Sequence, residues 1–185
     1  MIWNNHSEDT DDHAFLSPSN YHWINYDIPK LVNVFKNDYA KKEGVIMHEF
    51  AATAIEKKYK LAKSKKTLNL YVNDCIGFNM RPEQRLFYSF NAFGTTDAIS
   101  FKDNVLRIFD LKTGVVKASF KQLEVYAALF CLEYTINPKD ISIQLRIYQN
   151  NEYLEYYPDS DHILTIMARI VEFDQVIEDL KKELN

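Results

Sequence analysis

The chain has 185 residues, 46% of them hydrophobic, only four glycines and a formal net charge of −4. This size and composition indicate an ordered protein with a real core and exclude a disordered or low-complexity chain. The acidic total argues against indiscriminate binding of nucleic acid. No run of 18 apolar residues suggests a membrane span, and the polar N-terminus is unlike a secretory signal. We therefore expect a cytoplasmic protein.

The first half of the chain is predicted to be mainly helical. Residues 1–13 are expected to form a flexible acidic arm, and residues 14–185 a single domain. Serines at 17 and 19 precede a short helix, and Asp27 precedes another that ends in the polar stretch before Gly44. A further helix is expected from Gly44 through the lysine-rich end of its pattern. The next covers residues 68–78, and Arg81-Pro82 ends it.

The second half is predicted to alternate strands and helices. Residues 84–93 are rich in aromatics and predict a strand. Two apolar runs, 97–101 and 105–110, flank a polar turn and predict a hairpin. A helix over 119–137, with Ser119 as a possible cap, is followed by strands at 141–148 and 153–157 and a final amphipathic helix over 159–184. This order predicts an α/β fold with a mixed central sheet flanked by helices.

The hairpin suggests a metal site. A turn centred between Asp103 and Asn104 makes opposed positions sum to 207, so Asp97 faces Asp110, and Lys112 shares their face. Two carboxylates held so close repel one another unless a cation joins them, and a divalent metal with oxygen ligands would do so. The alternative is an ordinary surface ion pair, and a single bulge would turn Asp97 to the opposite face.

Other candidate residues have plain structural explanations as well. His48 lies in a largely apolar helix and fits either a core histidine or a ligand. The lysines between 57 and 66 fit a solvated helix end or a surface that follows a phosphate backbone. Cys75 is expected in the core. The aromatic stretch 87–93 is expected in the core rather than as a platform for stacked bases.

Several segments, taken in order, resemble the PD-(D/E)XK nuclease superfamily, specifically its RecB-like branch, which includes phage recombination exonucleases and CRISPR-associated nucleases. The likeness runs from about Ser17 to Tyr126. It is carried by Ser17-Pro18-Ser19, Gly44-Val45-Ile46-Met47-His48, Gly94-Thr95-Thr96-Asp97, Asp110-Leu111-Lys112 and Gln122-Leu123-Glu124-Val125-Tyr126. Each segment alone is weak, and the order and intervals make the set specific.

The resemblance implies a restriction-endonuclease-like core and a set of site residues. His48, Asp97 and Asp110, with the Leu111 carbonyl, would hold Mg²⁺ or Mn²⁺, and Lys112 would help to activate the attacking water. Gln122 and Tyr126 would support the site and contact DNA. With only Cys75 and Cys131, no iron–sulfur cluster is expected. The lysines expected to bind DNA are Lys57, Lys58, Lys63, Lys65 and Lys66.

These observations predict a divalent-metal-dependent DNA nuclease that hydrolyses phosphodiester bonds. A phage-type exonuclease acting in DNA recombination, replication or degradation is favoured. A structure-selective endonuclease, a non-catalytic nucleic-acid-binding or assembly module with a nuclease fold, and a purely structural protein are the alternatives. The expected partner is DNA, together with further copies of the chain or a recombination or replication protein. Polarity, strand preference and sequence specificity stay open.

Overall fold

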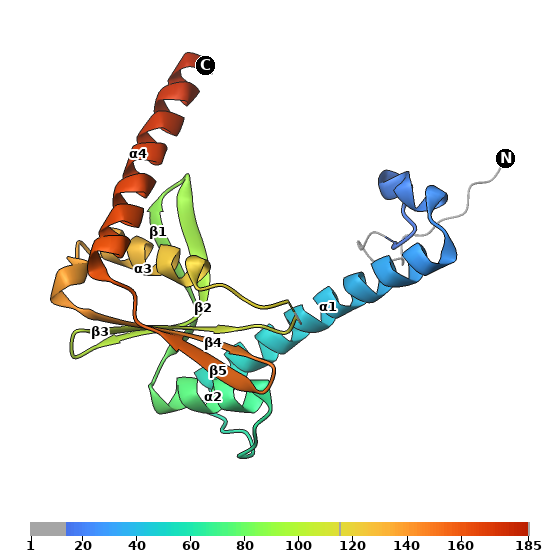
Figure 1. Cartoon of the computed structure of the whole chain (residues 1–185), viewed down its shortest axis with the longest axis horizontal. Coiled ribbons are helices and arrows are strands. Elements are labelled where there is room, and N and C mark those ends of the chain that lie inside the picture. Colours follow the sequence, from blue (N-terminus) through green and yellow to red (C-terminus); the bar gives the residue numbers. More distant parts are fainter. Residues whose placement is uncertain (1–13, 115, 185) are drawn as a thin grey trace. The chain divides into compact units, whose positions relative to one another are not determined.

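The computed structural model describes residues 14–114 and 116–184 and has the predicted α/β architecture, a mixed five-stranded sheet flanked by helices (Figure 1). The strand order is β1-β2-β3-β4-β5, and β3 and β4 run parallel whereas the other neighbours are antiparallel. The elements are η1 (Pro18–Asn25), α1 (Ile28–Glu56), α2 (Thr67–Gly77), β1 (Arg81–Ser89), β2 (Ala92–Lys102), β3 (Val105–Leu111), α3 (Lys121–Glu133), η2 (Pro138–Asp140), β4 (Ser142–Gln149), β5 (Glu152–Tyr156) and α4 (Ser160–Leu184).

The chain divides into two compact units, one ending at Glu43 and the other beginning at Gly44. The boundary lies inside α1 and was not predicted from the sequence. The second unit contains the sheet and every candidate site residue. The expected arm over residues 1–13 lies outside the described residues, and the single domain over 14–185 stays a prediction.

The predicted short helix lies in the first unit as η1. The Ser17 hydroxyl accepts a hydrogen bond from the Ser19 backbone N–H at 3.2 Å, and the Ser17 carbonyl accepts one from the Trp23 indole at 3.0 Å. The Asp27 carboxylate accepts from the Lys30 backbone N–H at 2.8 Å, which caps the start of α1. Both predicted helix starts are therefore confirmed.

Gly44 does not end a helix, contrary to the sequence prediction, because α1 runs through it to Glu56. The glycine is buried, and a Cβ atom there would lie 2.9 Å from the Thr113 hydroxyl oxygen. The missing side chain thus lets α1 come close to the segment after β3. A glycine inside a helix lowers its stability by about 1 kcal/mol relative to alanine. The helix also ends earlier than predicted, so that Lys57–Lys66 form a loop rather than a helix end.

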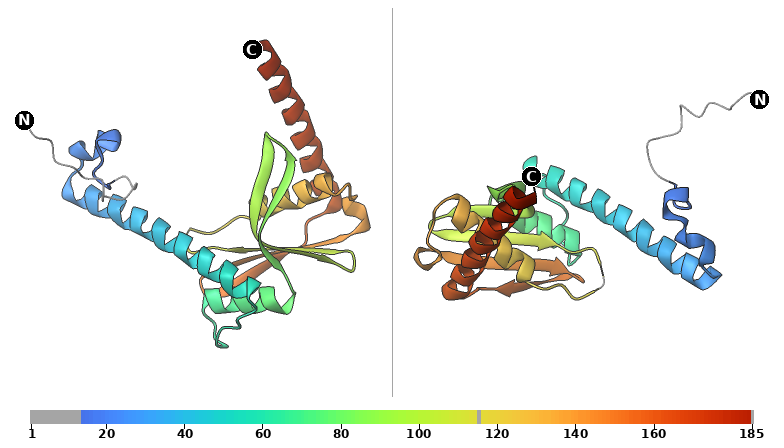
Figure 2. Two further views of the ribbon diagram at one scale, coloured as in Figure 1. Left: turned by 180° about the vertical axis from the view of Figure 1, so that it is seen from behind. Right: turned by 90° about the horizontal axis from the view of Figure 1, so that it is seen from above.

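The sheet has a core on each face. On one face, α3 and α4 pack over a cluster that includes Leu86, Ile108 and Leu145. On the other, α2 and the last part of α1 pack over a cluster that includes Phe109 and Tyr148 (Figures 1 and 2). Cys75 lies in this second core, as predicted, and is fully buried. The helices on both faces hold the strand ends in fixed positions.

The hairpin between β2 and β3 is as predicted. Asp103 and Asn104 both have positive φ, at 52° and 57°, which a tight two-residue turn requires. Ile99 pairs with Ile108 and Phe101 with Leu106, so the register sum of 207 is confirmed.

The hairpin between β1 and β2 differs from the prediction. β1 begins at Arg81 and turns at Phe90, so the last two residues of the predicted strand, Ala92 and Phe93, belong to β2. The expectation that the aromatic stretch 87–93 is core is wrong for its phenylalanines. Phe90 is 85% exposed, and Phe87 and Phe93 are exposed too, because they lie near the tip of a hairpin that rises away from the sheet (Figure 2).

The C-terminal elements match the predictions to within a few residues, and β5 pairs with β4 as expected. Ser119 lies one residue before the helix cap position, Phe120, and its hydroxyl accepts from the Lys121 backbone N–H at 3.3 Å. Within residues 14–114 and 116–184, no helix is both long and apolar enough to cross a membrane.

Candidate metal centre

Two carboxylates meet where β2 begins its pairing with β3. The ladder ends at the Ala98–Phe109 pair, and the next positions along it are Asp97 and Asp110. One Asp97 carboxylate oxygen, Oδ2, accepts a hydrogen bond from the Leu111 backbone N–H at 2.8 Å. That bond fixes the Asp97 side chain beside the end of β3, so the predicted proximity of the two strand ends is confirmed.

Asp110 is the buried member of the pair, with 4% of its surface exposed. Its Oδ1 accepts from the Lys112 ammonium at 3.0 Å, whereas its Oδ2 is buried and has no hydrogen-bond partner. Burial, and next the charge of Asp97, raise the pKa of Asp110 to about 6. A buried oxygen without a hydrogen-bond partner makes the folded state less stable, and a bound cation would remove that cost.

His48 reaches the site from α1. Its Nδ1 lies 3.4 Å from Asp97 Oδ2. The hydrogen bond to Asp97 raises the pKa of His48; burial opposes the shift, and the charges of Asp97, Asp110 and Glu83 add to it. The structure therefore brings His48 together with the hairpin carboxylates, and it is neither a core residue nor isolated.

Glu83 is a site residue that the sequence analysis missed. One ligand atom from each of His48, Glu83 and Asp97 lies within 4.8 Å of the others. Glu83 has a φ of 47°, a strained value for a glutamate, in a strand that pairs on either side of it with Ala98 and Thr96. Burial, and then the charge of Asp97, raise the pKa of Glu83. Glu83 could have been found only from the pairing of β1 with β2, in which the numbers of paired residues sum to 180.

The predicted supporting residues, Lys112, Gln122 and Tyr126, form a chain of hydrogen bonds that leads away from the carboxylates. The Lys112 ammonium donates to Gln122 Oε1 at 3.0 Å, and Gln122 Nε2 donates to the Tyr126 hydroxyl at 3.4 Å. The Tyr126 ring packs on Gly94, where an added Cβ would lie 2.8 Å from a ring carbon. Gly94 thus leaves room for Tyr126, and Tyr126 with Gln122 orients Lys112.

The predicted DNA-binding lysines are all exposed in the loop between α1 and α2. The end of this loop is tied to the β4–β5 turn, because Thr67 and Asn151 exchange backbone-to-side-chain hydrogen bonds of 3.2 and 2.8 Å. Since β3 and β4 are parallel, that turn lies at the same end of the sheet as Lys112. Lys65 and Lys66 are therefore near the site's end of the sheet, and no described contact brings Lys57, Lys58 or Lys63 to it.

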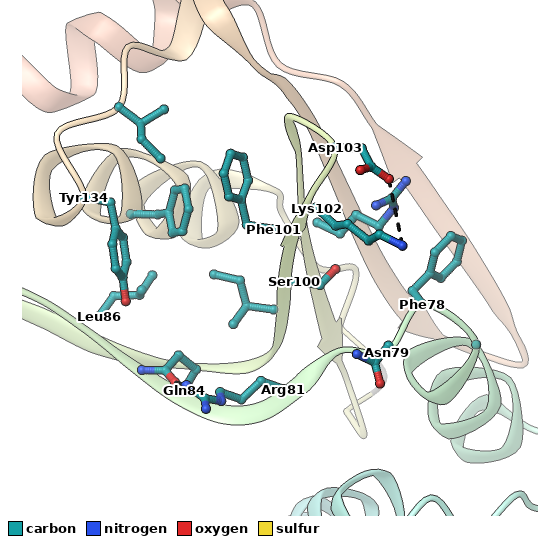
Figure 3. A pocket seen from close by; sticks show the side chains of 15 residues that line it. Phe78, Asn79, Arg81, Gln84, Leu86, Ser100, Phe101, Lys102, Asp103 and Tyr134 are labelled. Carbon is teal, nitrogen blue, oxygen red and sulfur yellow. Dashed lines mark hydrogen bonds and ion pairs between the residues drawn. The ribbon is translucent and has the colours of Figure 1, made fainter.

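A pocket of about 910 Å³ is lined by the second half of β2 together with residues of β1, the end of α2 and α3 (Figure 3). Its walls combine aromatic rings with cationic side chains, and the buried Ser100 hydroxyl oxygen in its lining has no hydrogen-bond partner. Arg81 and Gln84, which flank Glu83 in β1, line it and are joined by a 3.1 Å hydrogen bond. The rings are those of Phe78, Phe101, Phe130 and Tyr134, and the other cations are Lys102 and Arg107.

The donor set fits a hard divalent cation. Carboxylate oxygens suit Mg²⁺ and Mn²⁺, and one imidazole favours Mn²⁺ slightly. The unpartnered Asp110 oxygen has lone pairs with which it could coordinate such a cation. The side chains could also orient a phosphate group, since Lys112 supplies a compact positive charge beside them.

No family model matches the chain, and no curated protein or solved structure matches it either. The interpretation of the site therefore rests on its own geometry and on the motifs in the sequence.

Proposed function

We propose that this chain is a divalent-metal-dependent DNA nuclease with a PD-(D/E)XK core of the RecB-like branch, and that it acts as a phage-type exonuclease. The observation that carries the proposal is the meeting of His48, Asp97, Asp110 and Lys112 at one end of the sheet, with one Asp110 oxygen buried and unpartnered. A non-catalytic binding module would have no need of such a set.

Asp97, Asp110, His48 and the Leu111 carbonyl would hold the metal, and Glu83 would add a further carboxylate. Bound Mg²⁺ or Mn²⁺ supplies a lowered pKa for attacking water and a positive charge for the phosphate. Three carboxylates against the one lysine beside them leave an excess of negative charge, which a divalent cation offsets.

Lys112 has the position of a residue that orients the attacking water. Its ammonium is held by Asp110 on one side and Gln122 on the other, at 3.0 Å each. Hydrolysis adds one water across a P–O bond, so one product strand gains a phosphate end and the other a hydroxyl end. Tyr126, through Gln122, fixes the direction in which Lys112 points.

The surroundings suggest a path for the DNA strand. The aromatic pocket of Figure 3 and the candidate metal centre share a stretch of β1, because Arg81 and Gln84 line the pocket and Glu83, between them in sequence, belongs to the centre. Aromatic rings beside cationic side chains are the usual surface for unpaired nucleotides. The strand whose phosphate is cut would thus place a neighbouring base in this pocket, and Lys65 and Lys66 would contact the backbone elsewhere at the same end of the sheet as Lys112.

The test is cleavage of one DNA, labelled at either end and also supplied as a closed circle, with Mn²⁺, Mg²⁺ or EDTA. We expect metal-dependent loss of linear DNA with the circle intact, and a loss of about 10³-fold or more in Lys112→Ala and Asp110→Ala. Glu172→Gln, at an exposed position of α4, is the control and should keep full activity.

Full activity in Lys112→Ala or Asp110→Ala would end the proposal. Nicking of the circle would make the protein an endonuclease instead. DNA binding without cleavage in the presence of any divalent ion would favour the non-catalytic module. A melting temperature that does not change on addition of Mn²⁺ would favour a structural protein.

A further inference from the structure

Exposed side chains form a strip along one face of the β1–β2 hairpin. Side chains alternate between the two faces of a strand, and exposure alternates with them over residues 82–88 and 92–98. On the opposite face, Leu86 is fully buried and the Gly94 position lies against the Tyr126 ring. The exposed strip consists of Glu83, Arg85 and Phe87 on β1 and of Phe93, Thr95 and Asp97 on β2.

The strip changes its chemistry from one end to the other. Glu83 and Asp97 stand at one end, in the candidate metal centre. Arg85 comes next along β1, and the paired residues Phe87 and Phe93 stand at the other end. At a rise of about 3.3 Å per residue, the phenylalanine pair lies about 13 Å along the strands from the carboxylates. The strip therefore leads from aromatic rings, past a cation, to the candidate metal centre.

The aromatic end has the geometry of a stacking surface. The rings of Phe87 and Phe93 are nearly parallel, at an angle of 21° with their centres 6.1 Å apart, and the Phe90 ring meets Phe87 edge-on at 5.5 Å. The Arg85 guanidinium lies over the Phe93 ring, 4.2 Å from its centre. Exposed rings beside a guanidinium bind nucleotide bases by stacking and by cation–π contact.

The hairpin holds these rings on a fixed support. The Asp174 carboxylate accepts hydrogen bonds from the Ser89 hydroxyl and the Asn91 amide, and the Glu178 carboxylate accepts one from Asn91 at 2.7 Å. These bonds tie the tip of the hairpin to α4 (Figure 1). A ligand on the rings would therefore meet a surface that is already ordered, which lowers the entropic cost of binding.

The backbone edge of the hairpin argues against a peptide as the ligand. The Phe87 N–H donates to the Glu133 carboxylate at 2.9 Å, and the Arg85 carbonyl accepts from the Gln84 amide at 2.6 Å. A peptide that extends a sheet needs such edge groups to be free. Since side chains of the same molecule already use them, the strip offers its rings and its cation rather than its backbone.

We propose that this strip binds an unpaired DNA strand and leads it to the candidate metal centre, with bases on the phenylalanine rings and a phosphate at Arg85. The inference rests on the proposed nuclease and names its substrate as DNA with a single-stranded end or segment, because the base faces of a duplex are already covered. The Arg85 guanidinium has no carboxylate partner among the described residues, so it can contact a phosphate. A length of about 13 Å corresponds to about four nucleotides of a stacked strand, or fewer of an extended one.

The test measures the affinity of a fluorescent single strand in EDTA. The double variant Phe90→Ala, Phe93→Ala should bind at least about tenfold more weakly, because each stacked base contributes about fivefold or more. The matched control is Phe173→Ala. This ring of α4 is 52% exposed and also lies beside a guanidinium, that of Arg169 at 5.2 Å, and its removal should leave the affinity unchanged. The circular dichroism spectrum and the stabilisation by Mn²⁺ should be the same in both variants as in the original chain.

A second variant tests the phosphate contact. Arg85→Gln should reduce the slope of log affinity against log salt concentration by about 0.7, the value for one phosphate contact on a single strand. An unchanged slope would overturn the placement of a phosphate at Arg85.

Two further results would overturn the inference as a whole. One is equal affinity of the double variant and the Phe173→Ala control for the single strand, and the other is tighter binding of a blunt duplex than of a single strand of the same length. In either case, Mn²⁺-dependent cleavage by the original chain would still support the proposed nuclease. Conversely, a chain that cuts no DNA but loses affinity in the double variant would support the strip and count against the nuclease.

Discussion

Two charged clusters lie on this sheet, and they differ in how completely their charges are satisfied. On β4, the Arg146 side chain is 12% exposed and is paired with Asp74 and Glu155. Asp74 also accepts from the Tyr148 hydroxyl at 2.7 Å, and Glu155 from the Gln144 amide at 2.8 Å. The guanidinium lies 4.6–5.2 Å from the ring centres of Phe78, Phe109 and Tyr153.

The candidate metal centre at the end of β3 is organised in the opposite way. Carboxylates outnumber the lysine there, and Asp110 Oδ2 has no partner. A buried network whose members are all paired specifies the fold, whereas one with a missing partner keeps a place for something else. We therefore attribute the Arg146 cluster to the stability of the fold and propose the Asp110 cluster as the functional site.

The largest expected difference between the clusters is in folding. Arg146→Met should lower the free energy of unfolding by about 3–5 kcal/mol, because Asp74 and Glu155 would lose their buried cation. Lys112→Met should cost less than half as much, because Asp110, whose pKa is already raised to about 6, can take up a proton when it loses the ammonium of Lys112. Urea unfolding of both variants measures this. Equal losses would remove the distinction between the clusters.

The second prediction concerns the pH dependence of the metal-free protein. The pKa of Asp110 is raised to about 6 from 3.8, so its proton binds better to the folded state than to the unfolded state. The stabilisation from that proton is fully present below about pH 4 and is lost as the pH rises through 6. Asp110→Asn should therefore raise the free energy of unfolding at pH 8 by on the order of 2–3 kcal/mol.

Measurement needs EDTA and urea unfolding of both proteins at pH 4, 6 and 8. The gain from Asp110→Asn should grow with pH, and Mn²⁺ should no longer stabilise the variant. A gain that is constant across this range would mean that the charge of Asp110 is not what costs stability.

Much of the candidate site could be predicted from local sequence. Asp103 and Asn104 tolerate positive φ, so they fix the turn, and the turn fixes the register that brings Asp97 to Asp110. Helical spacing alone puts Gln122 and Tyr126 on one face. These parts depend on neighbours in the chain, which is why they were predictable.

The parts that were missed depend on distant contacts. Glu83 joins the site only through the register of β1 on β2, and that register is irregular near Phe87. Gly44 looked like a helix end, whereas it is a point of close approach to Thr113, nearly 70 residues later. Neither contact leaves a periodic signal in the sequence.

The third prediction tests whether Glu83 belongs to the unsatisfied cluster. Mn²⁺ at 100 times its dissociation constant should stabilise the original chain by about 2.7 kcal/mol. Glu83→Gln should weaken Mn²⁺ binding about tenfold, or ~1.4 kcal/mol, because a charged oxygen ligand becomes a neutral amide. The control is Glu49→Gln, an exposed residue next to His48 in α1. Melting curves over a Mn²⁺ series measure both, and identical midpoints would exclude Glu83 from the centre.

The smallest expected effect concerns the aromatic pocket. Its lining includes the Ser100 hydroxyl oxygen, which is buried and unpartnered like Asp110 Oδ2. If that pocket takes an unpaired base, Phe101→Ala should weaken binding of single-stranded DNA about fivefold, near the lower end of 1–3 kcal/mol per stacked base. Stabilisation by Mn²⁺ should be unchanged, because Phe101 lies away from the carboxylates. Tyr39→Ala, an exposed aromatic of the first unit, is the control. Fluorescence anisotropy in EDTA measures binding without cleavage. If Phe101→Ala and the original chain bind single-stranded DNA equally well, the pocket does not take a base. Among the described residues, Asp110 Oδ2 would then be the only unpartnered buried oxygen for which a ligand is proposed.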